Sequence, residues 1–214
     1  MKRIAAVATA VALAAGVVVG VGGGDRLGGQ PAYALVPPDI PTTSPSPTTS
    51  PTPTTQPRQA CPTTGRPFVP RTITVRGVTR RARVVAPPRV NGVPGAPPLT
   101  SAGKQQFAWD RKWRRPGSRH GNVLLNAHVW PDGSAVGNRM LKKLKIGHRI
   151  VVLGKTKKIC YRVVDKVVVD ASKTLLRYYR TDGKPRLGIV VCSGKRLGPG
   201  VWTKRTVWFA KPSS

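Results

Sequence analysis

Apolar and polar residues alternate in short runs along the chain after residue 66, a pattern typical of β-strands. Glycine and proline clusters at 88–98 and 194–200 separate several runs and indicate turns. Seven or more strands with few helices predict an all-β domain, either a closed barrel or a sandwich. The runs that predict strands are 72–75, 82–85, 122–130, 149–153, 159–169, 187–192 and 206–210.

Helical periodicity is limited to two places. Within 134–145, Val136, Met140 and Leu144 fall on one face of a helix, and a glycine follows just past its end. A second short helix is expected from about residue 170 or 172. The expected fold is therefore all-β with one or two short helices.

The chain begins with an apolar segment. Residues 4–24 carry no charge and follow Lys2 and Arg3; as a helix they would span about 32 Å, enough to cross a bilayer. A cleaved secretory signal is the alternative, since Ala-Tyr-Ala at 32–34 has the form of a cleavage site. That site lies well past the apolar run, so we favour an uncleaved membrane anchor within 1–30, with the rest of the chain exported.

A segment rich in proline, threonine and serine follows. These three types make up 18 of the 21 residues in 37–57, a composition that does not pack into a core and favours an extended path. At about 3.1 Å per residue this stretch would span roughly 65 Å. We therefore expect an extracellular stalk at 31–65 and a folded domain at 66–214, long enough to bury a core.

The chain is strongly basic, with 37 lysines and arginines against seven acids and a formal net charge of +30. Such a surface attracts polyanions, among them nucleic acids, anionic lipids and acidic cell-wall polymers. Export argues against nucleic acid as a partner, and the cations do not alternate with an aromatic stacking platform. An anionic cell envelope is the expected environment.

Three cysteines are present, Cys61, Cys160 and Cys192, and an odd number leaves at least one thiol unpaired or paired between chains. A bridge between Cys61 and Cys160 would tie the stalk to the domain and leave Cys192 free, but the sequence does not determine the pairing. Cys192 ends an apolar run, with Lys195, Arg196, Lys204 and Arg205 nearby in the sequence; such cations lower the pKa of a thiol and favour the nucleophilic thiolate. The alternative is a small buried residue at a strand end.

A nucleophilic thiol needs a base, and the chain has three histidines. His128 lies in a strand-like run, His148 opens another and His120 lies in a cationic loop, so spacing alone does not select one. No histidine or cysteine pair has the spacing of a metal site, and without glutamate the chain offers poor calcium ligation. We expect neither a metal nor another cofactor.

The order and spacing of one histidine, one cysteine and one arginine point to a known family. His128 follows Asn-Ala, Cys192 closes the run IVVC 64 residues later, and Arg205 follows 13 residues after that in KRTVWFA. Together with WPDGSAVGNRMLKKLKIGHRIVV at 130–152, this order resembles the sortases, cysteine transpeptidases of the Gram-positive cell surface. It is most similar to the class F and class E types of actinobacteria. The resemblance covers roughly residues 66–212 and implies a closed eight-stranded β-barrel.

By this resemblance Cys192 would be the nucleophile, His128 the general acid and base, and Arg205 the cation facing the oxyanion. The family cleaves LPXTG-like signals between Thr and Gly and holds the acyl part as a thioester. It then transfers that part to an amine of a peptidoglycan precursor or a pilin. The implied partners are secreted proteins with an LPXTG-like or LAXTG-like C-terminal signal. The implied location is the cell membrane, anchored through 4–24, with the catalytic domain outside.

Some positions depart from the usual sortase pattern. Val191 stands in place of the usual threonine before the cysteine, and Ala127 in place of the usual glycine before the histidine. His148 falls where relatives often carry aspartate. Arg196 is a rival to Arg205 for the cationic role, although its spacing from the cysteine fits less well.

Two other functions fit parts of the sequence. A non-catalytic basic module that binds anionic cell-wall polymers would leave Cys192 inert. An L,D-transpeptidase is also a wall enzyme with a cysteine nucleophile, but that family expects a Ser-His-Gly-Cys run, whereas Cys192 follows two valines. The sortase-like function is favoured over both.

Overall fold

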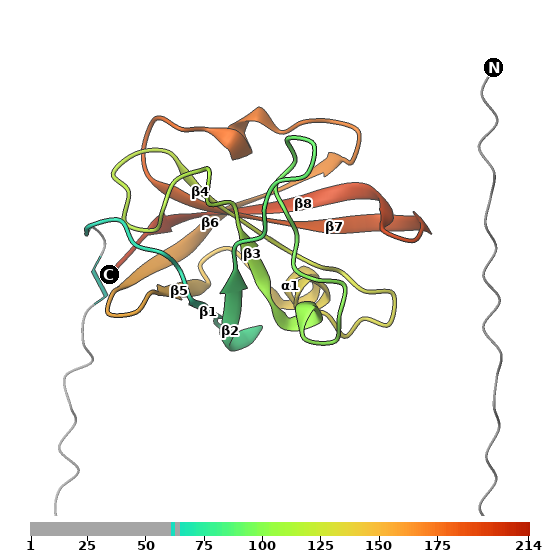
Figure 1. Cartoon of the computed structure of the whole chain (residues 1–214), viewed down its shortest axis with the longest axis horizontal. Coiled ribbons are helices and arrows are strands. Elements are labelled where there is room, and N and C mark those ends of the chain that lie inside the picture. Colours follow the sequence, from blue (N-terminus) through green and yellow to red (C-terminus); the bar gives the residue numbers. More distant parts are fainter. Residues whose placement is uncertain (1–60, 63–64) are drawn as a thin grey trace, which may run out of the picture. The chain divides into compact units, whose positions relative to one another are not determined.

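The computed structural model describes residues 61–62 and 65–214. Eight strands close into a barrel in the order β1-β2-β3-β4-β7-β8-β6-β5 (Figure 1), which confirms the expected all-β, eight-stranded architecture. The strands are β1 (Thr72–Val75), β2 (Thr79–Val85), β3 (Phe107–Trp109), β4 (Asn122–Ala127), β5 (Arg149–Leu153), β6 (Lys158–Asp170), β7 (Arg186–Gly198) and β8 (Val201–Pro212). The helical elements of the described residues are α1 (Val136–Lys143) and the short 3₁₀ helices η1 (Gly103–Gln105) and η2 (Leu176–Tyr179).

Most elements lie where the sequence pattern predicts them, with three differences. Strand β3 was not predicted, because its three residues are all buried and show no alternation. The cluster 194–200, predicted as a turn, is mostly strand, because β7 and β8 continue as a hairpin in which Arg196 pairs with Trp202. The helix expected from residue 170 or 172 is the short 3₁₀ helix η2.

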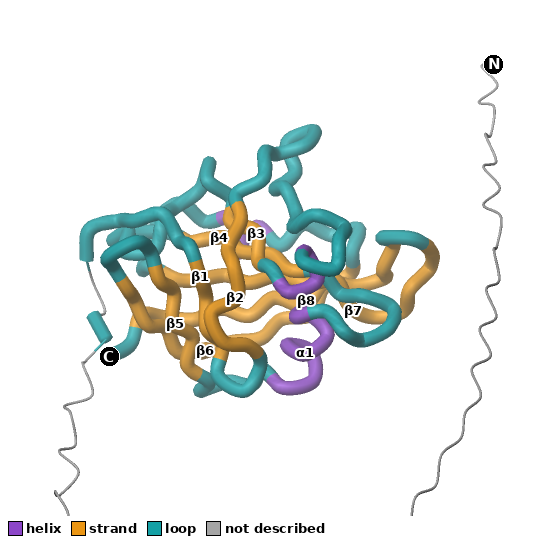
Figure 2. The backbone as a smooth tube through the Cα atoms, turned by 60° about the horizontal axis from the view of Figure 1, so that its bottom comes forward, coloured by secondary structure: helices purple, strands orange, loops and turns teal. Residues whose placement is uncertain are grey.

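Two pairs of strands are parallel, β2 with β3 and β4 with β7, and the other pairs are antiparallel. Parallel pairing requires a long connection between the two strands. The connection between β2 and β3 is the proline-rich segment 86–106, which contains η1, whereas α1, β5, β6 and η2 lie between β4 and β7 in the chain. Figure 2 shows the strands, in orange, forming the body of the domain, with α1, in purple, beside them. This topology brings distant parts of the sequence onto adjacent strands.

Large apolar side chains fill the barrel interior from alternate positions of the strands. On β7 these are Leu187, Ile189 and Val191, and on β8 they include Trp208. Because successive side chains of a strand point to opposite faces, the residues between them point outward. Cys192 on β7 and Arg205 on β8, which pair with each other, fall on such outward positions.

A second apolar cluster covers part of that outer face. Leu124, Val207 and Phe209 pack there against Tyr178 of η2. The Tyr178 hydroxyl donates a hydrogen bond of 2.8 Å to a main-chain carbonyl of β4. Gly188 on β7 leaves space for this ring, because a Cβ there would lie 2.9 Å from it. The segment around η2 is therefore packed onto the strands and does not extend into solvent.

A disulfide joins Cys61 to Cys160 on β6, with Cα atoms 5.6 Å apart. Cys192 is the free thiol of the described residues. The sequence left the disulfide pairing open, and the structure contains the pairing that leaves Cys192 as a free thiol. Cys160 lies near the start of β6, which pairs with the last residues of β8, so the bond holds residue 61 far along the barrel from Arg205.

The expected membrane anchor, 4–24, and the run 37–57 of the expected stalk lie outside the described residues. Over 61–62 and 65–214, none of the helices combines the length and the apolar character needed to cross a membrane. Anchoring through 4–24 therefore stays a prediction.

Candidate functional site

Cys192, His128 and Arg205 form a row at one end of three neighbouring strands: Cys192 lies on β7, Arg205 lies on β8, and His128 directly follows β4. Cys192 on β7 pairs with Arg205 on β8. On the other side of β7, Ala127 pairs in parallel register with Val191, so His128, the next residue of the chain, continues this register beside Cys192. Neighbouring strands are about 4.8 Å apart and paired residues point to the same face. The fold thus brings together the three residues that the sequence analysis selected.

The row lies on the outer face of the barrel, next to the core but not in it. His128, Cys192 and Arg205 are each half-buried. Val191, which stands where sortases usually have threonine, is only 2% exposed and belongs to the core. The valine therefore changes the barrel interior and not the face that carries the row.

Burial favours the protonated form of the Cys192 thiol. Burial is the largest influence and raises its pKa, and the positive charge of Arg205 opposes this effect without reversing it. The expectation that surrounding cations lower the pKa is therefore correct for Arg205 but wrong in the net direction, because desolvation of the thiolate dominates. At neutral pH Cys192 needs a neighbouring group to take its proton.

His128 is the histidine of the three that lies in this row. His148 directly precedes β5, which β6 and β8 separate from β7 in the barrel. Its Nδ1 is buried and has no hydrogen-bond partner in the described residues. His120 is exposed in the loop before β4. The parallel pairing of β4 with β7 therefore places His128, and not His120 or His148, beside Cys192.

A loop from the β2–β3 connection contacts the His128 imidazole. Its Nε2 lies 2.6 Å from the carbonyl oxygen of Pro97. Because a carbonyl oxygen only accepts hydrogen bonds, Nε2 carries the hydrogen in this contact. Nδ1 is then the nitrogen of a neutral ring that can accept a proton. The ring also meets Trp130 edge to face, with centroids 5.9 Å apart.

The first turn of α1 fixes the main chain around His128. The Gly137 N–H, one of the helix donors without an intrahelical partner, donates to the His128 carbonyl at 3.0 Å. A Cβ at 137 would collide with that carbonyl, so glycine permits the close approach. The Asn138 side chain bonds the main-chain N–H and carbonyl of Trp130, at 2.8 and 3.0 Å. The sequence analysis missed these positioning residues; the closeness of α1 to the histidine in the chain was the available signal.

Main-chain carbonyls hold the Arg205 guanidinium. Its Nη1 donates to Trp202 at 3.3 Å and to Lys204 at 3.0 Å. No acid of the described residues forms an ion pair with it. Arg196, the other candidate for the cationic role, pairs with Trp202 in the β7–β8 hairpin, four residues further along β7 than Cys192. The register therefore places Arg205, and not Arg196, opposite Cys192.

The loop that contacts His128 makes a second bond to the same face. Asn126, two residues before His128 on β4, donates from Nδ2 to the Gly95 carbonyl at 2.8 Å. A Cβ at Gly95 would collide with the Pro88 carbonyl, so the loop also packs against itself. Segment 95–97 thus lies against β4 beside the row.

In the part of the chain that the structure describes, no cluster of three His, Cys, Asp or Glu side chains is placed to hold a metal ion.

Solved structures with this fold are sortases. The chain aligns with sortase A of Listeria monocytogenes at a TM-score of 0.50 and 18% identity, covering 67% of this chain and 86% of that one. With sortase C1 of Streptococcus agalactiae it aligns at a TM-score of 0.51 and 16% identity, covering 67% of this chain and 66% of that one. With sortase C-1 of Actinomyces oris it aligns at a TM-score of 0.50 and 15% identity, covering 67% of this chain and 73% of that one. At such identities the likeness shows the sortase fold. No protein-family model and no curated protein matches the sequence.

Proposed function

We propose that this protein is a cysteine transpeptidase of the sortase type, with Cys192 as nucleophile, His128 as general acid and base, and Arg205 as the cation facing the oxyanion. The observation that carries the proposal is the row formed by Cys192 on β7, Arg205 on β8 and His128 directly after β4. A thiol, an imidazole and a guanidinium in such a row are the groups that acyl transfer through a thioester requires. The sortase fold supports the same assignment.

In the first half-reaction, neutral His128 takes the proton of the Cys192 thiol and the thiolate attacks the scissile carbonyl carbon. A C–S bond forms while the carbonyl π electrons move to oxygen, and Arg205 stabilises the oxyanion. The intermediate then collapses and the C–N bond breaks. The imidazolium of His128 gives its proton to the leaving amine, and the acyl part remains on Cys192 as a thioester.

In the second half-reaction, an acceptor amine attacks the thioester carbonyl and loses a proton to His128. Arg205 stabilises the second oxyanion, and Cys192 leaves and recovers its proton. One amide has been exchanged for another, without an oxidant, a metal or a cofactor. Because burial raises the pKa of Cys192, catalysis depends on His128 from the first proton transfer.

The proposed substrate is the C-terminal signal of a secreted protein, LPXTG-like or LAXTG-like, cleaved between Thr and Gly. The proposed acceptor is an amine of a peptidoglycan precursor or a pilin, and the class F or class E actinobacterial type is the proposed class. The anchor at 4–24 would hold the enzyme at the cell membrane with its catalytic domain outside. The sequence resemblance supports these details, and the net charge of +30 suits an anionic envelope.

A non-catalytic module that binds anionic wall polymers is the second candidate. The same charge of +30 favours it, because general attraction to polyanions requires no catalytic row. The two candidates differ in what they require of Cys192. A wall-binding module would bind its polymer equally well with alanine at this position, whereas the transpeptidase would be inactive.

The test is cleavage of fluorogenic peptides containing Leu-Pro-x-Thr-Gly or Leu-Ala-x-Thr-Gly by the full chain, purified in a nonionic detergent. We expect cleavage after threonine and an acyl adduct on Cys192 detected by mass spectrometry. Activity should be lost in Cys192→Ala, His128→Ala and Arg205→Ala but retained in Arg196→Ala, the matched cation of the hairpin. Absence of cleavage and adduct in the folded protein would favour the wall-binding module.

A further inference from the structure

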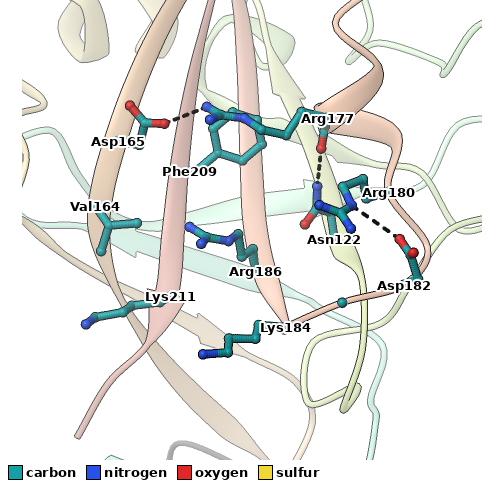
Figure 3. Close-up of a pocket in the computed structure, with 11 residues that line it drawn as sticks. Asn122, Val164, Asp165, Arg177, Arg180, Asp182, Lys184, Arg186, Phe209 and Lys211 are labelled. Carbon is teal, nitrogen blue, oxygen red and sulfur yellow. Dashed lines mark hydrogen bonds and ion pairs between the residues drawn. The ribbon is translucent and has the colours of Figure 1, made fainter.

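A pocket of about 640 Å³ lies on the same outer face as the Cys192 row, at the other end of β4, β7 and β8 (Figure 3). Asn122 pairs with Arg186 there, and Lys211 continues this register on β8. Arg186 precedes Cys192 by six residues on β7, which is about 20 Å along a strand. The cluster around Tyr178 covers the rows between them. The pocket is therefore separate from the Cys192 row.

Positive charge dominates the lining of this pocket. Five of the lining residues are cations and two are acids, which leaves three positive charges in excess. The cations are Arg177, Arg180, Lys184, Arg186 and Lys211. They come from η2, from the loop that follows it and from the ends of β7 and β8, so only the folded chain gathers them.

Both acids of the pocket are already paired with arginines. Asp165 accepts a hydrogen bond of 2.5 Å from Arg177, and Asp182 accepts one of 3.2 Å from Arg180. The bond from Arg180 also lowers the pKa of Asp182, which favours its ionised form. These pairs neutralise two of the five cations.

The remaining three cations, Lys184, Arg186 and Lys211, form no ion pair with an acid of residues 61–62 or 65–214. All three are among the side chains that line the pocket in Figure 3. Like charges gathered in one concave site repel each other, and a bound anion replaces that repulsion with attraction. The pocket thus carries three positive charges without an acidic partner among the described residues, and a bound anion would neutralise them.

One wall of the pocket is held in place by buried contacts. Asn122, 3% exposed, donates from Nδ2 to the carbonyls of Arg177 and Tyr178, at 2.8 and 3.0 Å. The guanidinium carbon of Arg177 lies 4.3 Å from the centroid of the Phe209 ring. This wall is therefore ordered without a ligand, which reduces the entropy that binding must cost.

We propose that this pocket binds a phosphate-bearing ligand with at least two negative charges, for which a diphosphate group is the best match. Three unpaired cations match such a ligand better than they match a single carboxylate. The planar guanidinium of Arg186 can bind two phosphate oxygens at once, and Lys184 and Lys211 act as point charges. A volume of about 640 Å³ is in the usual range for small-molecule sites. This binding is independent of the proposed transpeptidase activity.

The test is calorimetric titration of the full chain, in a nonionic detergent, with inorganic pyrophosphate. Salt at about 0.15 M screens the distant surface charges. We expect saturable binding to one site, weakened roughly tenfold or more in the triple variant K184Q/R186Q/K211Q. Should Arg186→Gln disturb β7, the double variant K184Q/K211Q, at two exposed positions, provides the comparison. Binding as tight in these variants as in the unmodified chain would overturn the proposal.

A matched control separates the pocket from the general basicity of the protein. The variant K142Q/K143Q/K145Q removes three exposed lysines in and just after α1. Each triple variant lowers the net charge by three, so any general attraction falls equally in both. We expect the control to bind pyrophosphate within about twofold of the unmodified chain. An equal loss in the two triple variants would overturn the proposal.

Further titrations distinguish the sources of the phosphate. Citrate carries several carboxylates, and binding as tight as that of pyrophosphate would contradict the assignment to phosphate. Vesicles of phosphatidylglycerol that bind only with the pocket intact, and that pyrophosphate displaces, would identify a lipid headgroup. Pocket-dependent pyrophosphate binding without vesicle binding would identify a soluble phosphate compound. Either of the last two results supports the proposal.

Discussion

The carbonyl oxygen of Pro97 lies 2.6 Å from Nε2 of His128. The two residues are 31 positions apart, and their contact joins the β2–β3 connection to the end of β4. In the proposed mechanism His128 moves protons to and from the substrate. The loop therefore covers the Nε2 edge of the imidazole and leaves Nδ1 outside this contact, and a molecule that needs the Nε2 edge must displace the loop.

The first prediction concerns this loop. Asn126→Ala removes its second bond, to Gly95, and one such hydrogen bond contributes about 1 kcal/mol. The loop should then open about fivefold more often. Carbethoxylation of His128 by diethyl pyrocarbonate, located by mass spectrometry, should accelerate by about the same factor. The exposed His120 is the internal control, and its rate should not change. An unchanged rate at His128 would show that the loop does not limit access.

The second prediction concerns the pH dependence of Cys192. Because burial raises its pKa, alkylation by iodoacetamide should reach half its maximal rate above the pH of an ordinary thiol. Arg205→Gln removes the charge that opposes the shift, so the midpoint should move to still higher pH and the rate at neutral pH should fall. Arg205→Lys keeps the charge and should stay close to the unmodified protein. Identical profiles for the glutamine and lysine variants would contradict the role of charge.

A third prediction concerns the packing of η2 on the barrel. Gly188→Ala would place a Cβ 2.9 Å from the Tyr178 ring, and such overpacking costs about 1–3 kcal/mol in the free energy of unfolding. Gly198, on the same strand, is the matched control, because a Cβ there meets no atom within 4 Å. Gly198→Ala should change stability by no more than about 0.5 kcal/mol. Urea unfolding measures both, and equal effects would exclude the Tyr178 contact as the cause.

The fourth prediction concerns the disulfide. Cys61 and Cys160 are 99 residues apart, and a bond that closes a loop of this size stabilises by about 4.7 kcal/mol in the chain-entropy account. The variant C61A/C160A should lose stability of this order in urea unfolding, and reduction of the unmodified protein should have the same effect. The alkylation rate of Cys192 should not change, because the bond lies far along the barrel. A change in that rate would show that the two ends of the barrel are coupled.

Local pattern and tertiary pairing differ in how far the sequence reveals them. The runs 149–153 and 159–169 are rich in valine and isoleucine, and both are strands, because β-branched side chains favour the extended backbone. Strand β3, Phe107–Trp109, is too short and too fully buried to show the two-residue period of a strand. The row was expected from a resemblance to a family, and the register across β7 is what shows how His128 comes to lie beside Cys192.

The sequence by itself determined the all-β class, most of the strands, and a short set of candidate site residues that includes Cys192. Residue spacing did not distinguish the three histidines, the disulfide pairing stayed open, and the sequence contained no sign that Pro97 would contact His128. It also showed the cations only as a scattered excess, although Lys184 and Lys211 meet at one pocket. Tertiary structure decided these points for one physical reason. Alternation depends on neighbouring residues alone, whereas the register between strands about 60 residues apart depends on how the whole core is buried.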